Sequence, residues 1–174
     1  KRIGIVGSFH RRRAAKMYFV GQKVTHPMHG AGIIEEIVAR REDGKERNFY
    51  TLKLCLGSLV LMLPCENCEH IGLRPVISSE EAHDFIEHLD QIEPQAVVNW
   101  NQRYRENMDR IKSGDLLQVA TVIRTLRTRE HHRGLSTGER KMLSAARKIL
   151  ISELMLAMDE SYDTIEHMID QKLA

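Results

Sequence analysis

The sequence predicts an α+β protein in which a small antiparallel β barrel precedes an all-helical domain of about five helices. Apolar residues recur with a period of two up to about residue 73 and with a helical period after residue 75. Turn-forming residues separate short β-branched runs only in the first of these parts. The chain has 174 residues, 42% of them hydrophobic and 29% charged, which is enough for one domain or two small ones.

The barrel is predicted from its turns and from one half-buried strand. The dipeptide Asp-Gly at 43–44 separates two apolar runs and indicates a hairpin, because glycine tolerates the positive φ of a tight turn. Gly-Ser at 57–58 predicts the next turn. The strand between these turns alternates, and its expected inward positions are Tyr50, Leu52, Leu54 and Leu56.

The following strand breaks this alternation. Leu59, Leu61 and Leu63 form one apolar face, while Val60 and Met62 make the opposite face apolar as well. A barrel of this size has a single core and cannot bury both faces. We therefore expect another part of the chain, or a partner, to cover Val60 and Met62.

Capping signals and glycines divide the second half of the chain into helices. The segments 78–81 and 136–139 each match a capping box, in which a serine is followed three residues later by a glutamate. Between them we expect a helix at about 95–112 and another from near Asp115 to Gly134. A long helix and a short one complete the chain.

Positive charge is concentrated in one part of the helical domain. The whole chain has 26 basic and 24 acidic residues, a net charge of +2. Residues 1–16 hold six basic and no acidic residues, so residues 17–174 have a net charge of −4. Within them, residues 95–150 have a net charge of +7 and lie between two acidic segments. A basic face for a phosphate backbone and salt bridges to the acidic segments explain this distribution equally well.

The helix expected at 95–112 carries the only tryptophan of the chain. At about 100° per residue, Tyr104 falls within its apolar arc, Trp100 lies at the edge of that arc, and Arg103 lies beyond it on the exposed side. A lone tryptophan is usually a core residue. Flanked by Arg103 and Arg105, it is also suited to stack on bases or to wedge into a base step.

The cysteines support only a weak metal-site hypothesis. Cys65 and Cys68 form a single C-x-x-C motif, and Cys55 and His70 would have to complete a zinc site. A thioredoxin-type redox role needs a βαβ context that this sequence lacks. We find no phosphate-binding glycine loop, nucleophile elbow or acid and base pair, so no catalytic residue, metal or cofactor is expected, and no enzyme activity.

The ends of the chain and its compartment are predicted from simple features. In residues 1–16 the basic residues follow the apolar stretch, which is unlike a secretory signal, so we expect a flexible extension before a native start at Met17. The barrel domain is then 17–74 and the helical domain 75–174. Three cysteines without framework spacing favour a reducing cytoplasm, and the apolar runs are too short to cross a membrane.

Short motifs also occur in a fixed order along both domains. The first contains Phe-Val-Gly-Gln-Lys-Val at 19–24, Pro-Met-His-Gly-Ala-Gly at 27–32 and Ile-Gly-Leu-Arg at 71–74. The second contains Asn-Trp at 99, Arg-Tyr-Arg at 103, Ser-Gly-Asp at 113, Val-Ile-Arg at 122, and Leu-Ser and Glu-Arg at 135 and 139. This order resembles the CarD family of bacterial transcription regulators. The first domain alone also resembles the polymerase-interacting module of transcription-repair coupling factors, and the helical half separates the two.

The resemblance implies a Tudor-like or SH3-like barrel that binds the β subunit of RNA polymerase. It also implies a helical domain that contacts promoter DNA at the upstream edge of the transcription bubble, where a tryptophan wedges into the minor groove and stabilises the open complex. Some relatives have a basic residue at the position of Met62, so we expect an apolar contact to replace a charged one there. The implied DNA-binding residues are Trp100, Arg103, Arg105, Arg129, Arg140 and Lys141, and the implied polymerase-binding residues are Arg40, Val60 and Met62.

We therefore expect a monomeric regulator of transcription initiation in the cytoplasm, associated with the nucleoid through RNA polymerase. It is expected to bind DNA without sequence specificity, because backbone contacts position a protein without reading bases. Two alternatives remain. One is a zinc or thiol protein centred on Cys65 and Cys68, and the other is an adaptor that binds polymerase without touching DNA.

Overall fold

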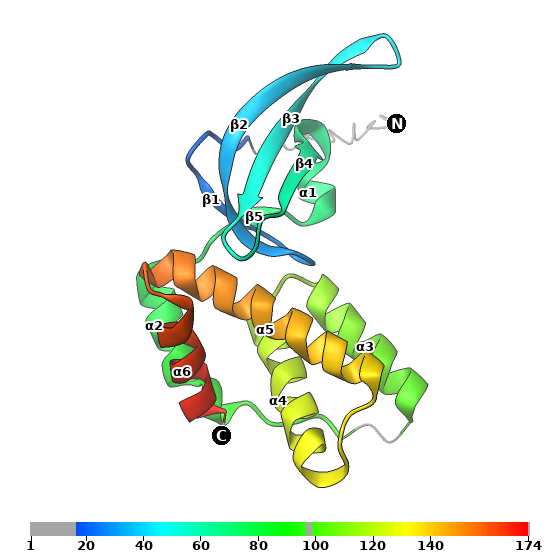
Figure 1. Cartoon of the computed structure of the whole chain (residues 1–174), viewed down its shortest axis with the longest axis vertical. Coiled ribbons are helices and arrows are strands. Elements are labelled where there is room, and N and C mark those ends of the chain that lie inside the picture. The colour runs from blue at the N-terminus through cyan, green and yellow to red at the C-terminus, as the bar shows by residue number, and fades with distance from the viewer. Residues whose placement is uncertain (1–16, 97–98, 174) are drawn as a thin grey trace, which may run out of the picture.

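The computed structural model describes residues 17–96 and 99–173, which form a β-sheet unit followed by a helical unit (Figure 1). The predicted α+β fold class is confirmed. The flexible extension expected at residues 1–16 lies outside the described residues. Of the helices that the structure describes, none combines the length and the apolar character needed to cross a lipid bilayer.

Five antiparallel strands form one curved sheet in the order β4-β3-β2-β1-β5 (Figure 1). The strands β4 and β5 are its two edges, so the predicted barrel is open between them. The boundary predicted after residue 74 falls inside the last strand. The strands are β1 (Lys23–His26), β2 (Gly30–Glu42), β3 (Lys45–Leu54), β4 (Val60–Pro64) and β5 (Arg74–Pro75).

The hairpin turn predicted between β2 and β3 is confirmed. Asp43 and Gly44 have φ angles of 50° and 76°, and Glu42 pairs with Lys45 across them. Two central residues with positive φ define a type I′ connection, whose twist matches that of the flanking strands. The next predicted turn is also present, where Gly57 has a φ of 84° between β3 and β4.

The sheet unit has a small core of its own. Tyr50, Leu52 and Leu54 are buried in it, as predicted. Leu56 differs, because β3 ends at Leu54 and the side chain of Leu56 packs against the helical core instead. The hydroxyl of Tyr18 donates to the carbonyl of Leu73 at 2.6 Å, which ties the start of the described chain to the segment before β5. A 3₁₀ turn, η1 (Cys65–Asn67), and a short helix, α1 (Cys68–Ile71), follow β4.

Among the described residues, five α-helices follow β5, in agreement with the prediction. Both capping boxes are formed: Ser78 and Ser136 accept from the backbone N–H of Glu81 and Glu139, whose carboxylates accept in turn from the cap backbone. The central helices α4 and α5 supply most of the buried apolar side chains. The helices are α2 (Ser79–Glu87), α3 (Trp100–Lys112), α4 (Leu116–Arg133), α5 (Thr137–Met158) and α6 (Tyr162–Lys172), with a 3₁₀ turn η2 (Leu89–Gln91) after α2.

The start of α3 differs from the prediction. The helix begins at Trp100 and not near residue 95. The reason is its cap: the side chain of Asn99 accepts from the backbone N–H of Gln102 at 3.2 Å, and Asn99 itself has an extended conformation. Helix α3 therefore begins after Asn99, a strong N-cap residue, and not after Pro94, where the sequence predicted its start.

Helix α5 packs against β1 and the start of β2. The backbone N–H of Ala31 donates to the hydroxyl of Ser152 at 2.8 Å. The ammonium of Lys23 donates to the carbonyl of Leu156 at 2.8 Å. These contacts place the sheet unit against the C-terminal half of α5 (Figure 1).

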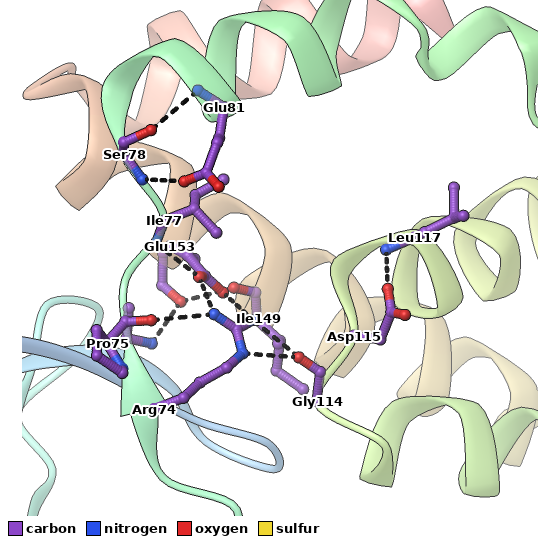
Figure 2. Close-up of polar contacts among 12 residues, drawn as sticks. Arg74, Pro75, Ile77, Ser78, Glu81, Gly114, Asp115, Leu117, Ile149 and Glu153 are labelled. Atoms are coloured by element: carbon purple, nitrogen blue, oxygen red, sulfur yellow. Dashed lines mark hydrogen bonds and ion pairs between the residues drawn. The ribbon is translucent and has the colours of Figure 1, made fainter. Parts of the chain in front are cut away.

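Arg74 makes a second link between the two units (Figure 2). Its guanidinium donates to both carboxylate oxygens of Glu153, at 2.5 and 2.9 Å, and twice to the carbonyl of Gly114, at 2.8 and 3.1 Å. Glu153 is fully buried on α5 and also accepts from the backbone N–H of Ile77 at 3.3 Å. Gly114 lies in the turn between α3 and α4. We call Arg74, Glu153 and Gly114 the Arg74 clamp.

The close approach of the two units at Gly30 gives a first prediction. Gly30 has a φ of 86°, and an added Cβ would lie 2.4 Å from the hydroxyl oxygen of Ser152. Gly30→Ala must therefore strain the backbone and displace Ser152, and we expect the free energy of unfolding to fall by about 2–4 kcal/mol in urea titrations. Gly44→Ala is the matched control, because its φ is also positive but nothing lies within 4 Å. That variant should lose only about 1 kcal/mol. Equal losses would contradict the packing described at Gly30.

Candidate nucleic-acid interface

Trp100 lies in the first turn of α3 and its side chain is 46% exposed. Its ring stacks on that of Tyr104, with centroids 5.5 Å apart and an interplanar angle of 24°. The indole N–H donates to the hydroxyl of Ser136, the N-cap of α5, at 3.4 Å. Trp100 is therefore an accessible, supported aromatic side chain and not a core residue.

The buried stripe of α3 is only partly apolar, and two residues of this helix lie elsewhere than expected from the sequence. Its buried residues are Arg103, Asn107 and Ile111, spaced four apart. Tyr104, expected in the apolar arc, is 39% exposed, so that prediction is wrong. Its ring lies outside the stripe, against Trp100.

Arg103 is only 3% exposed, and the expectation that it faces solvent is also wrong. Its Nε and Nη2 groups donate to Oε1 of Glu139 at 2.9 and 2.8 Å. The Nε atom of Arg129 lies 3.2 Å from the same oxygen. Hydrophobic periodicity assigns an arginine to the surface, because it carries no information about a buried partner. Arg103 thus fixes α3 to α5, and its charge is not presented to solvent.

Glu139 connects these cations to the tryptophan. Its second oxygen accepts from the backbone N–H of Ser136 at 3.0 Å and from the Ser136 hydroxyl at 2.9 Å. Burial alone would raise the pKa of Glu139, but hydrogen bonds from Ser136 and Arg103 outweigh it and hold that pKa below its usual value of 4.5. The carboxylate is therefore ionised at neutral pH. A continuous network runs from Arg103 through Glu139 and Ser136 to Trp100.

Arg129 contacts this network, and two further basic residues follow Glu139 along α5. Arg140 and Lys141 are exposed in the first turn of α5, and the guanidinium of Arg140 is oriented by bonds to the carbonyl of Leu135 at 2.8 and 3.1 Å. Arg129, near the end of α4, has a side chain that is 30% exposed. We define the Trp100 site as Trp100, Tyr104, Arg129, Arg140 and Lys141.

Arg105 is not brought into the Trp100 site. It is exposed, but it lies about 140° around α3 from Trp100. It lines a surface hollow with two acidic residues, Glu106 and Asp109. The sequence places Arg105 beside Trp100 along the chain, and the helix separates them in space.

The second apolar face predicted at 59–63 lies at the surface. Strand β4 is an edge of the sheet, and its Val60 and Met62 are 45% and 36% exposed. The described residues leave both side chains partly open to solvent. Leu63 is buried on the other face, as expected, whereas Leu59 is exposed because it precedes the first residue of β4. We call Val60 and Met62 with their strand the β4 edge.

Arg40 lies apart from the β4 edge. It is exposed on β2, opposite Arg47 in the outer part of the β2–β3 hairpin. Met62 pairs with Thr51, which pairs with Glu36. Arg40 is four residues beyond Glu36, a distance of about 13 Å along the strand. The structure therefore does not place Arg40 next to the two apolar side chains.

The cysteines lie in or near the sheet core. The thiol of Cys68 is buried and donates to the carbonyl of Pro64 at 3.2 Å. Burial raises the pKa of Cys68 to about 11, and burial also raises the pKa of Cys65. Neutral thiols are poor metal ligands and nucleophiles. Within residues 17–96 and 99–173, no three His, Cys, Asp or Glu side chains are grouped to hold a metal ion. The described residues thus offer no support for the zinc or thiol alternative.

Comparison with known proteins agrees with the division into a sheet unit and a helical unit. A family model described as the CarD-like/TRCF RID domain matches residues 18–77, and one described as the CarD C-terminal domain matches residues 84–170. A relative from Bacillus subtilis (strain 168), named "Putative transcription factor YdeB", is 31% identical over 138 residues. These are 79% of this chain and 90% of the relative.

A Tudor-like sheet unit joined to a helical unit of this type defines a transcription-associated protein of two domains. The chain belongs to the CarD-like family.

The Glu139 network gives a second prediction. Glu139→Gln leaves the buried Arg103 without its anionic partner, so we expect the free energy of unfolding at pH 7 to fall by about 3 kcal/mol. Because the folded-state pKa of Glu139 is lowered, its contribution is present above the unfolded value near 4.5 and is lost as the pH falls through the folded value. The difference in the free energy of unfolding between wild type and Glu139→Gln should therefore be smaller when urea titrations are repeated at pH 3.

The exposed Glu130 provides the control. Glu130→Gln should change the stability by less than about 0.5 kcal/mol at both pH values. If Glu139→Gln lowers the free energy of unfolding by the same amount at pH 3 and pH 7, the role assigned to the ionised carboxylate is contradicted.

Proposed function

We propose that this protein regulates transcription initiation by binding the β subunit of RNA polymerase with its β4 edge and promoter DNA with its Trp100 site. Binding at the upstream edge of the bubble would stabilise the open complex. The observation that carries the proposal is the exposed stack of Trp100 on Tyr104, in which the indole N–H is bound by Ser136 at the start of α5. Arg140 and Lys141 are exposed near the start of the same helix. Membership of the CarD-like family supports a role in transcription.

The Trp100 site has the chemistry of a wedge at a base step. Tyr104 supports the indole and Ser136 holds its N–H, so a base would meet a ring that is already oriented. Arg140 and Lys141 would pair with phosphates of the flanking backbone. Neither interaction reads a base edge, so no sequence specificity is proposed. Arg103 has no direct contact in this scheme and serves to hold α3 in place.

Stabilisation of the open complex requires only a difference in affinity. A protein that binds melted promoter better than closed promoter shifts the equilibrium toward the melted form by that difference. A tenfold shift corresponds to about 1.4 kcal/mol. Stacking of one base on an aromatic side chain contributes about 1–3 kcal/mol. One indole and a few phosphate contacts therefore suffice, without covalent chemistry.

The β4 edge has the chemistry of a protein-docking strand. An unpaired edge presents backbone N–H and C=O groups that can pair with a strand of a partner. Val60 and Met62 would be covered in such a complex, which accounts for an apolar face that the described chain leaves exposed. In this scheme the chain acts as a monomer in the cytoplasm and reaches the nucleoid through the polymerase.

Tethering to the polymerase is part of the proposal, because residues 17–174, which contain both proposed binding surfaces, have a net charge of −4. The acidic segments of this part repel the phosphate backbone, which weakens binding to free DNA. A protein held by the polymerase meets the promoter at a high effective concentration, which compensates for weak intrinsic binding.

Removal of the indole tests the DNA contact. Trp100→Ala should retain the melting temperature and the affinity for polymerase, because the ring is half exposed, and it should shorten the lifetime of the open complex at least fivefold. The lifetime is measured by heparin challenge of preformed open complexes. Leu117→Ala is the control, since Leu117 is an equally exposed apolar residue on α4. An unchanged lifetime for Trp100→Ala, with binding of wild type to forked duplex that does not depend on salt, would favour an adaptor without DNA contact.

Introduction of a charge tests the β4 edge. Met62→Glu should raise the dissociation constant for the isolated polymerase β lobe at least tenfold, because the carboxylate would be desolvated in the interface. The exposed position predicts little change in melting temperature. Leu117→Glu places the same charge on the helical unit and should leave the affinity for the lobe unchanged. Equal affinities of wild type and Met62→Glu would refute this interface.

A further inference from the structure

We infer that Arg74 and Glu153 are positioning residues that hold the Trp100 site at a fixed distance and angle from the β4 edge. The chain would then act as a rigid spacer between polymerase and DNA, and this inference rests on the proposed function. Neither binding surface can fix its own position relative to the other, and the inference assigns this role to the Arg74 clamp.

The two surfaces lie in different units, and only one covalent connection joins these units. The sheet unit ends at β5, α2 begins at Ser79, and residues 76–78 lie between them. Units joined by a single short connection move relative to one another unless noncovalent contacts prevent it. The orientation of the Trp100 site therefore depends on the contacts between the units.

Ala31 and Lys23 contact α5, and the Arg74 clamp adds the contact that reaches the end of α3. Helix α3 runs from the Trp100 site, at the end of the molecule remote from the sheet, to the Gly114 turn beside β5 (Figures 1 and 2). At its far end α3 is held by Arg103 and Glu139. At its near end Arg74 holds Gly114 while pairing with Glu153. The helix that carries Trp100 is thus fixed at both ends, once to α5 and once to the sheet.

The geometry of the clamp requires an arginine. One planar guanidinium meets both oxygens of Glu153 and, on another edge, the carbonyl of Gly114. A lysine ammonium keeps the charge but is a single point donor on a flexible stem, and it cannot hold a carboxylate and a carbonyl in one fixed plane. Arg74→Lys therefore separates the presence of the charge from the fixing of orientation.

The inference is tested with the full chain, RNA polymerase holoenzyme and a promoter. We expect the amide residual dipolar couplings of wild type to fit one alignment tensor, whereas Arg74→Lys should need separate tensors for the sheet and helical units. Arg74→Lys should retain the affinity for the polymerase β lobe within twofold and shorten the open-complex lifetime at least threefold. Glu153→Gln, which keeps the shape of the side chain, should give the same pattern.

The matched control is Arg147→Lys, the same change at an arginine that pairs with Glu166 and Asp170 within the helical unit. It should fit one tensor and leave the lifetime unchanged. A single tensor for Arg74→Lys, or two tensors with an unchanged lifetime, would overturn the inference. If wild type itself does not prolong the open complex, the proposed function fails, while the tensors still report whether Arg74 couples the units.

Discussion

A buried carboxylate on α5 determines how the molecule is assembled. Glu153 has no contact with solvent, and an unpaired charge in that position would destabilise the fold by about 3–5 kcal/mol. Its hydrogen-bond donors come from Arg74 in β5 and from Ile77 in the connection that follows. The helical unit therefore cannot satisfy its own core without the last strand of the sheet. Separation of the two units would remove the guanidinium of Arg74 from this carboxylate.

A second buried glutamate is paired with an arginine at the other end of α5. Glu139 is buried in the first turn and is paired with Arg103, and Glu153 follows 14 residues later, about 21 Å along the helix. One acid orients the start of α3 and the other fixes its end through Arg74 and Gly114. Helix α5 thus holds α3 directly at one end and through Arg74 of β5 at the other. The position of Trp100 follows from these two attachments.

Interactions between neighbouring residues predict most of the fold, and the wrong predictions lie where polar side chains are buried. The turn at Asp43, the two capping boxes and the change of period after residue 75 depend on neighbouring residues only, so they can be read from the chain. The solvent position assigned to Arg103 failed because its partner Glu139 lies 36 residues away on another helix. The position assigned to Tyr104 was wrong for the same reason, because the polar residues Arg103 and Asn107 occupy part of the stripe that was expected to be apolar. The exposure of Trp100, by contrast, was among the alternatives that its neighbours suggested.

The exposed β4 edge has a consequence for copies of the protein that are not bound to a partner. An exposed edge strand with apolar side chains pairs with any available strand, including that of a second copy. The edge is short, and Pro64, which has no N–H, closes one end of it, so self-association is restrained and not abolished. In the proposed function the polymerase covers this edge, so only unbound copies expose it to one another. The tendency to self-associate would therefore rise with the concentration of unbound protein.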